Sequence, residues 1–320
     1  MDPLHTASWK GLDNIHNDLE LPDGFARNAV NVDFTSGGKI AVRSGSVLLS
    51  AGEARSGVAF DPYILFVRSG VIQAYHTHTA VLTSLGLSAI GDRLGSAIVR
   101  KAAYLSDGLS KWKINPDLTV SAWEYPAVDD PTFDMRFVRP MPACPKMVYF
   151  QGRIIGAVGR MLFYSYPAAF GAYDPITGFV ILPWEVKVLH TNNDAIFVAG
   201  DEVMVLTGLG TPGMAMDYVA APPSWDMGAA VDPETGLGYW ATSRGIITVP
   251  FNGIEIEQKT LSHHAVRQVE RGAAVVTKHN GTTRIIAAAR ADTSGAAEHP
   301  LVASDFSLSE ALRQEKFNAI

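Results

Sequence analysis

A pattern of two apolar runs joined by a short glycine-bearing turn recurs along the chain, and it constrains the fold more than any other feature. In the first copy, Tyr63 to Val67 leads into a polar turn that ends at Gly70, and a second apolar-rich run continues to Tyr75. Runs of β-branched and aromatic residues on both sides of such a turn are typical of a β-hairpin. The turn glycines of the six copies are Gly70, Gly108, Gly152, Gly200, Gly245 and Gly281.

The spacing of these glycines points to a repeat architecture. Successive turn glycines lie 36 to 48 residues apart. A period of roughly 40–50 residues, with two strong strands and room for two more, is typical of a β-propeller blade. One hairpin alone is marginally stable, so neighbouring units must cover its faces. The sequence therefore predicts an all-β fold, a six-bladed β-propeller over residues 51–306, with the six glycines at equivalent turns. A β-sandwich with regularly spaced hairpins is the alternative.

Residues 1–50 differ from the repeats and predict an extended N-terminal arm. Polar and apolar residues alternate over Asn31–Phe34 and over Lys39–Arg43, on either side of a glycine turn, which indicates a strand, a tight turn and a strand. Phe25–Val30 follows a Pro-Asp-Gly turn and could form a single helical turn. An unpaired sheet edge invites aggregation. We therefore expect a strand near Lys39–Ser50 to close the ring by pairing with the last blade.

Residues 307–320 predict a short C-terminal helix. Ser307 and Glu310 have the spacing of a capping box, and helix-forming residues follow as far as Phe317. Leu308 and Leu312 would share one face of this helix. Such a face would dock on the body of the protein or on a neighbouring subunit.

Composition excludes several classes of protein. The formal net charge is −6, whereas dedicated nucleic-acid binders carry a basic surplus that neutralises phosphates. A mildly acidic protein surface would repel the phosphates and would still let DNA slide past without binding it. Cys144 is the single cysteine, so no intrachain disulfide can form, which suits a reducing cytoplasm, and we expect it to be a small buried residue. The sequence shows no signal peptide and no apolar run long enough to span a membrane.

No set of residues carries the pattern of a catalytic, cofactor or metal site. His76 and His78 would share one face of a strand, but no third ligand is near in the sequence. Asp129, Asp130 and Asp134 could supply the carboxylate pair that glycosidases need, although a turn-rich acidic connector explains them more simply. The sequence also lacks a nucleophile elbow, a phosphate-binding loop and a dinucleotide fingerprint. We therefore predict no catalytic, cofactor-binding or metal-binding residues, no cofactor and no enzymatic activity.

The N-terminal stretch resembles a known group of proteins. Its blocks are Lys10-Gly-Leu-Asp-Asn14, Leu21-Pro-Asp-Gly24, Ala26-Arg-Asn-Ala-Val-Asn-Val-Asp33, Gly38-Lys-Ile40 and Arg43-Ser-Gly45. In this order they resemble the N-termini of tailed-bacteriophage tail structural proteins. The nearest group is the β-propeller nozzle or hub proteins of short-tailed (podovirus-like) phages. The sequence departs from that pattern at Asp13, where such arms often carry asparagine.

The resemblance implies a structural role in a virion. It implies a non-catalytic nozzle, hub or adaptor of the tail, assembled in the bacterial host cytoplasm as a ring of six copies around the DNA channel used in genome ejection. The implied partners are other copies of the chain, tail proteins on the adaptor or portal side, and tail fibres, while DNA passes without sequence-specific binding. The alternatives are a six-bladed propeller glycan hydrolase or lyase, and a propeller lectin or protein-binding scaffold.

Overall fold

The computed structural model describes most of the repeat region and shorter pieces at both ends. It describes residues 54–260 except 92, 128–131 and 227, together with the strands within 11–42, 269–291 and 306–307. The chain divides into two compact units, one of residues 50–219 and one formed by residues 1–49 and 220–320. Each unit is described by itself below.

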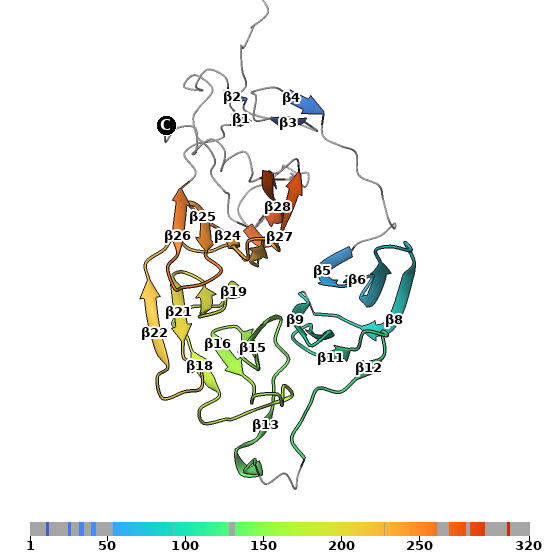
Figure 1. The fold of residues 1–320 in the computed structure, drawn as a ribbon, viewed down its shortest axis with the longest axis vertical. Helices are drawn as coiled ribbons and strands as arrows, with labels where there is room; N and C mark the ends of the chain where they lie inside the picture. The colour runs from blue at the N-terminus through green and yellow to red at the C-terminus, as the bar shows by residue number, and fades with distance from the viewer. Residues whose placement is uncertain are drawn as a thin grey trace, which may run out of the picture. The chain divides into compact units, whose positions relative to one another are not determined.

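The unit of residues 50–219 contains four four-stranded antiparallel sheets that follow one another along the chain (Figure 1). Blade 1 consists of β5 (Ala54–Phe60), β6 (Tyr63–Arg68), β7 (Val71–His76) and β8 (Leu82–Ser88). Blade 2 consists of β9 (Gly95–Val99), β10 (Ala102–Ser106), β11 (Lys111–Ile114) and β12 (Val120–Ser121). Blade 3 consists of β14 (Lys146–Phe150), β15 (Arg153–Val158), β16 (Met161–Tyr164) and β18 (Phe179–Ile181). Blade 4 consists of β19 (Val188–Thr191), β20 (Ile196–Ala199), β21 (Val203–Thr207) and β22 (Ala215–Val219).

Two short elements join blades 2 and 3. The 3₁₀ helix η1 (Met135–Phe137) precedes β13 (Arg139–Pro140), which pairs with β17 (Ala172–Tyr173). The proline-dense stretch between Pro140 and Pro145 then leads into β14. Proline cannot donate to a sheet ladder, so this stretch is confined to the crossing between blades, as the sequence predicts.

The core of this unit lies between successive sheets. One apolar cluster joins blades 1 and 2 and includes Leu65 and Leu105. A second joins blades 2 and 3 and includes Tyr104 and Ile154. A third joins blades 3 and 4 and includes Leu162. Each sheet therefore buries its faces against its neighbours in the chain, which is the packing of a β-propeller.

The second unit contains a fifth four-stranded sheet and three smaller ones. Blade 5 consists of β23 (Ala230–Val231), β24 (Gly238–Thr242), β25 (Gly245–Val249) and β26 (Glu257–Thr260). A three-stranded sheet follows, made of β27 (Val269–His279), β28 (Thr282–Ala291) and β29 (Phe306–Ser307). Two two-stranded sheets are formed by β1 (Gly11–Leu12) with β2 (Phe25–Ala26), and by β3 (Val32–Phe34) with β4 (Ile40–Val42). The all-β propeller class predicted from the repeat is confirmed.

Turn chemistry explains the position of the hairpins. Ser69 and Gly70, which join β6 to β7, both have positive φ, as do Gln151 and Gly152 between β14 and β15. Two-residue turns with both φ values positive match the twist of the flanking strands. Glycine adopts this conformation at no steric cost, which is why glycine marks these turns in the sequence.

The prediction of equivalent turns is right for four glycines and wrong for Gly152. Gly70, Gly108, Gly200 and Gly245 lie at the connection between the second and third strands of blades 1, 2, 4 and 5. Gly152 instead joins the first and second strands of blade 3, where the corresponding connection contains Gly159. Both hairpins of blade 3 have glycine turns, so spacing alone selected the wrong one. Gly281 lies outside the described residues, although the pairing of His279 with Thr282 confirms a hairpin there.

Three predictions at the chain ends need correction or lie beyond the description. Phe25 and Ala26 form β2, which pairs in parallel with β1, so they do not begin a helical turn. The predicted strands at Asn31–Phe34 and Lys39–Arg43 are confirmed as the antiparallel pair β3 and β4. Among the described strands, β4 pairs with β3 alone. Residues 43–53 lie outside the described residues, so the ring-closing pairing of a strand near Lys39–Ser50 with the last blade stays a prediction. Ser307, predicted to cap a helix, ends β29, and residues 308–320 lie outside the described residues.

Candidate functional site

The two histidines considered as metal ligands stabilise a turn. His76 ends β7, and its Nδ1 accepts hydrogen bonds from the backbone N–H groups of His78 and Thr79, both at 3.2 Å. His78 lies in that turn, so the prediction that both imidazoles share a strand face is wrong. The two rings meet edge to face at 5.9 Å. Within the described part of the chain, no group of three or more His, Cys, Asp or Glu is placed to hold a metal ion. His263 and His264 lie outside it.

The acidic connector supplies a helix cap. The carboxylate of Asp134 accepts the backbone N–H of Arg136 at 3.1 Å and pairs with its guanidinium at 2.6 Å, which caps η1. Hydrogen bonds from Arg136 lower the pKa of Asp134. A glycosidase acid needs the opposite shift, because its carboxyl must remain protonated near neutral pH. Asp129 and Asp130 lie outside the described residues.

A hollow of about 500 Å³ lies beside this connector. It is lined by Thr132, Phe133, Asp134, Phe137, Tyr166, Pro167, Asp174, Ile176 and Thr177. Its second carboxylate belongs to Asp174, which accepts the N–H of Ile176 at 2.8 Å and the hydroxyl of Thr177 at 2.8 Å. Both carboxylates in the hollow therefore hold the conformation of their own loops.

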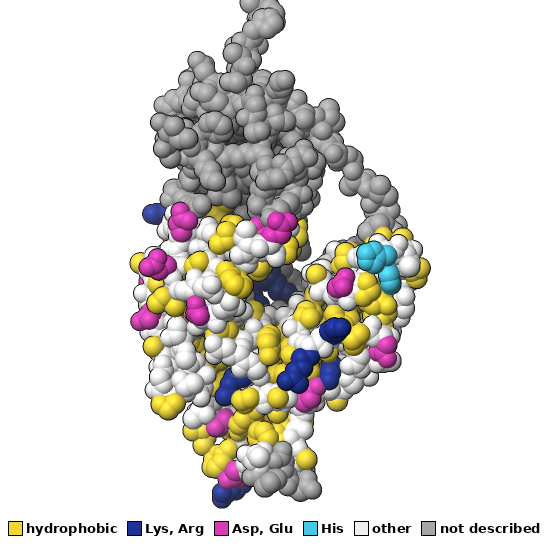
Figure 2. Space-filling view, in the orientation of Figure 1, with side chains coloured by type: hydrophobic (Ala, Val, Ile, Leu, Met, Phe, Trp, Pro, Cys, Tyr) yellow, Lys and Arg dark blue, Asp and Glu magenta, His cyan; other side chains and the backbone are white. Residues whose placement is uncertain are grey.

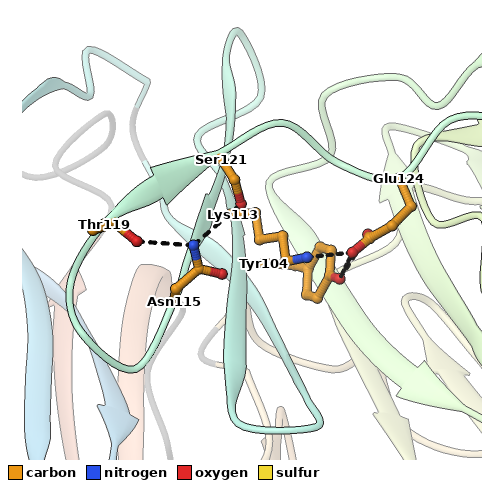
Figure 3. A network of polar contacts seen from close by, with 6 residues as sticks. All are labelled: Tyr104, Lys113, Asn115, Thr119, Ser121 and Glu124. Atoms are coloured by element: carbon orange, nitrogen blue, oxygen red, sulfur yellow. Dashed lines mark hydrogen bonds and ion pairs between the residues drawn. The ribbon is translucent and has the colours of Figure 1, made fainter.

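Sequence reasoning did not find a polar network in blade 2 in which the buried Tyr104 contacts the half-buried Lys113 and Glu124 (Figure 3). Tyr104 on β10 lies directly opposite Lys113 on β11. The tyrosine hydroxyl donates to the carboxylate of Glu124 at 2.7 Å, and the ammonium of Lys113 pairs with the same carboxylate. Figure 2 shows basic side chains over the part of the surface that Figure 1 labels β9 and β11.

The pKa shifts in this network keep Tyr104 protonated and Glu124 ionised at neutral pH. Burial and the hydrogen bond to Glu124 raise the pKa of Tyr104 well above its usual range. Burial alone would raise the pKa of Glu124, but the hydrogen bonds from Lys113 and Tyr104 outweigh it, so the net shift is downward. At neutral pH the tyrosine is a fixed donor and the glutamate a fixed acceptor. Neither group is suited to exchange a proton with a substrate near pH 7.

A second, separate set of polar contacts lies on the outer strands of the blade. The side-chain amide of Asn115 donates to the hydroxyl oxygens of Thr119 at 3.0 Å and Ser121 at 3.4 Å (Figure 3). These contacts hold the turn that leads from β11 to β12. The role of the polar contacts in blade 2 is therefore to stabilise the conformation of the blade.

Lys111 ties blade 2 to the crossing that leads into blade 3. Its ammonium donates to the carbonyl oxygen of Met141 and lies 5.2 Å from the ring centroid of Trp123. Burial lowers the pKa of this lysine. The neighbouring thiol of Cys144 is fully buried, as predicted, and burial raises its pKa to about 12. A thiol held in this protonated form is a poor nucleophile, because the thiolate is the reactive species.

Asp107 organises the turn between β10 and β11. Its buried carboxylate accepts backbone N–H groups of Gly91 at 3.0 Å, Leu109 at 2.9 Å and Ser110 at 2.7 Å. Burial raises the pKa of this carboxyl, but these hydrogen bonds outweigh it and the net shift is downward. An aspartate that caps its own turn is a local structural device. It also joins the loop before blade 2 to the middle of the blade.

Comparison with known proteins supports no family assignment. No family model and no curated protein sequence matches the chain. The Pan2 WD40 domain from Neurospora crassa is 14% identical, with 72% of this chain and 71% of that one covered and a TM-score of 0.48. A gluconolactonase from Xanthomonas campestris is 9% identical, with 74% and 83% covered and a TM-score of 0.45.

A third similar structure is the extracellular domain of a hybrid two-component system from B. thetaiotaomicron. It is 10% identical, with a TM-score of 0.45, and 72% of this chain matches it. The match spans only 31% of that chain.

Among the described residues, no helix is long and apolar enough to cross a membrane.

Proposed function

We propose that this chain is a non-catalytic structural component of a bacteriophage tail, a nozzle, hub or adaptor that forms a ring around the DNA channel. The observation that carries the proposal is the ordered set of blocks between Lys10 and Gly45, which resembles the N-termini of tail structural proteins. The partners are other copies of the chain in a ring of six, tail proteins on the adaptor or portal side, and tail fibres. The chain would reside in the virion tail.

The polar groups of the described residues support a structural role. The carboxylates of Asp107, Asp134 and Asp174 cap turns, and Glu124 is held by Tyr104 and Lys113. A hydrolase needs a carboxyl that can donate a proton and another that can attack or activate water. The pKa of Asp134 and that of Glu124 are both shifted downward, away from the acid role.

The charge of the chain fits a channel component that DNA passes. The net charge of −6 repels phosphates, so a duplex moving along the protein would not be held by counterion release. This role needs no base contacts and no sequence preference.

The test is a genetic deletion followed by complementation. We expect particles made without the chain to be non-infective and to lack part of the tail in electron micrographs, and the native chain to restore both. The native chain should also co-purify with DNA-filled particles in a density gradient. Absence of the chain from purified, infective particles would overturn the proposal.

Matched variants separate a structural role from an enzymatic one. Chains with Asp129, Asp130, Asp134, His76 or His78 singly changed to alanine should restore assembly as the native chain does. Glycan cleavage by the pure native protein, lost in any of these variants, would instead show a propeller hydrolase or lyase.

A further inference from the structure

The two carboxylates in the hollow beside the acidic connector differ in their partners. The carboxylate of Asp134 accepts the backbone N–H of Arg136 at 3.1 Å, its Nε at 3.0 and 3.1 Å, and its Nη2 at 2.6 Å, so its lone pairs are used. The Oδ1 of Asp174 accepts the N–H of Ile176, and its Oδ2 accepts the hydroxyl of Thr177. Each oxygen of Asp174 therefore retains a lone pair. Within the described part of the chain, no cation pairs with Asp174.

Arg136 shows what the first of these carboxylates binds. Its guanidinium pairs with Asp134 at 2.6 Å, and its Cζ lies 5.7 Å from the ring centroid of Phe137. The carboxylate accepts the N–H groups of the guanidinium, and the face of the ring attracts its positive charge. Asp134 and Phe137 both line the hollow, so one carboxylate and one aromatic ring of its wall already hold a guanidinium of the chain itself.

Asp174 lies among aromatic rings of the same kind. Tyr166 and Phe133 line the hollow with it, and their rings meet edge to face with centroids 5.0 Å apart. The hydroxyl of Tyr166 donates to the carbonyl oxygen of Phe137 at 2.9 Å, which fixes the tyrosine ring in place. Burial raises the pKa of Tyr166, and the charge of Asp174 raises it further, which indicates that this carboxylate lies near the ring. Arg153 acts on Tyr166 in the opposite direction but does not line the hollow.

We propose that Asp174, with the rings of Tyr166 and Phe133, binds the guanidinium of an arginine presented by a partner protein. A guanidinium offers two parallel N–H donors, which suit the open lone pairs on the two oxygens of one carboxylate. The hollow of about 500 Å³ has room for such a side chain. Asp174 is half-buried, and its contacts with Ile176 and Thr177 hold it in place before binding, which lowers the entropic cost.

Charge favours an arginine over a carbohydrate, the other ligand that combines an aromatic ring with a carboxylate. A sugar hydroxyl could donate to Asp174, but it would leave the negative charge of a half-buried carboxylate unpaired. A guanidinium is always protonated in proteins, so it supplies both the donors and the opposite charge. The inference names a partner chemistry that the proposed tail role leaves open. Its test uses the purified chain and short peptides, so its failure would leave the tail role standing.

Peptide binding to the purified full chain tests the charge requirement. The probe is acetyl-Gly-Arg-Gly-amide, and its matched control carries citrulline, which has the shape of arginine without the charge. Ligand-observed saturation-transfer NMR measures both. We expect millimolar binding of the arginine peptide that weakens as salt is added, and binding of the citrulline peptide that is about tenfold weaker. Equal binding of the two peptides, or binding of methyl glucoside without binding of the arginine peptide, would overturn the proposal.

Two variants with the same change of charge locate the site. Asp174→Asn keeps a side-chain oxygen for the N–H of Ile176 and removes the charge, so it should weaken binding of the arginine peptide about tenfold. Asp217→Asn removes an exposed carboxylate on β22, outside the hollow, and should leave binding unchanged. Circular dichroism of both variants checks that the fold is intact. Unchanged binding in Asp174→Asn, or an equal loss in both variants, would show that the net charge of the chain attracts the peptide and would overturn the proposal.

Discussion

At the scale of single residues, buried and half-buried polar groups hold turns and strands in place. Tyr104 and Lys113 are cross-strand partners whose polar ends meet on Glu124, a residue beyond β12. Asp107 performs a comparable task for the turn between β10 and β11. Buried donors and acceptors cost free energy when unpaired, so removing one partner of such a set destabilises the fold.

Replacing Tyr104 with phenylalanine removes the hydroxyl and leaves the ring in place. We expect a loss of about 1–2 kcal/mol in the free energy of unfolding, because Glu124 loses a short hydrogen bond to its carboxylate. Urea denaturation at pH 7 measures the loss. Tyr125→Phe is the matched control, since Tyr125 is exposed, and it should change little. Equal effects of the two changes would show that the hydroxyl of Tyr104 contributes nothing.

The pKa of Glu124 gives a prediction for acid stability. Its folded-state pKa lies below the ordinary value of 4.5, so its contribution to stability is present above about pH 4.5 and is lost as pH falls through the folded-state pKa. Glu124→Gln should cost about 1 kcal/mol at pH 7, a small value because the side chain is partly exposed and screened. On acidification below pH 4.5 the variant should lose less stability than the native chain. Parallel urea titrations at neutral and acidic pH would show this, and identical acid losses would contradict it.

At the scale of elements, some glycines allow a loop to lie close against a blade. A Cβ atom at such a glycine would overlap the neighbouring element. A Cβ on Gly91 would lie 1.8 Å from the carbonyl oxygen of Asp107. Gly57 on β5 has no atom within 4 Å of the same position. Gly91 therefore allows the loop before blade 2 to contact the turn that Asp107 organises. Gly57 has space around it for a larger side chain.

Gly91→Ala should therefore destabilise the protein by about 1–3 kcal/mol or more, because backbone atoms must shift to relieve the overlap. Gly57→Ala, the matched control, should be close to neutral. Thermal unfolding of the two variants beside the native chain measures the difference. A Gly91→Ala variant as stable as Gly57→Ala would show that the loop adjusts without cost.

At the scale of the whole molecule, the repeat of four-stranded sheets produces a propeller without any large helix in the described residues. In the unit of residues 50–219, each pair of successive sheets shares an apolar cluster, so stability accumulates from neighbour to neighbour. The arm contributes several large apolar residues outside this repeat: Leu4, Trp9, Leu12, Ile15, Leu19 and Phe25. Burying one such side chain contributes roughly 1.5–3 kcal/mol, so a few together can decide whether subunits associate.

Deleting residues 1–20 tests the role of the arm. We expect the truncated chain to retain its β-sheet signal in circular dichroism, because the deletion removes no strand of blades 1 to 5. It should attach more weakly to its tail partners in virion-assembly assays. Loss of the β signal would show that the arm belongs to the core, and unchanged incorporation would show that it joins nothing.

The sequence by itself determined the local elements of this protein. Alternating and apolar runs around glycine turns placed the hairpins at Gly70, Gly108, Gly200 and Gly245, because turn geometry and side-chain alternation are local properties. The register around the turn at Gly108 also makes Tyr104 and Lys113 cross-strand neighbours, a signal that could have been read from the sequence. The burial of Cys144 followed from its small apolar character.

Only the tertiary structure decided how these elements combine. Gly152 and Gly159 both carry turn signals, and the sheet order alone shows which one joins the second and third strands of blade 3. Glu124 meets Tyr104 only through the path of the chain beyond β12, 20 residues further along the sequence. The partner of β4 depends in the same way on which strands pair across the fold. Such pairings follow from burial and packing between distant segments, which no local pattern records.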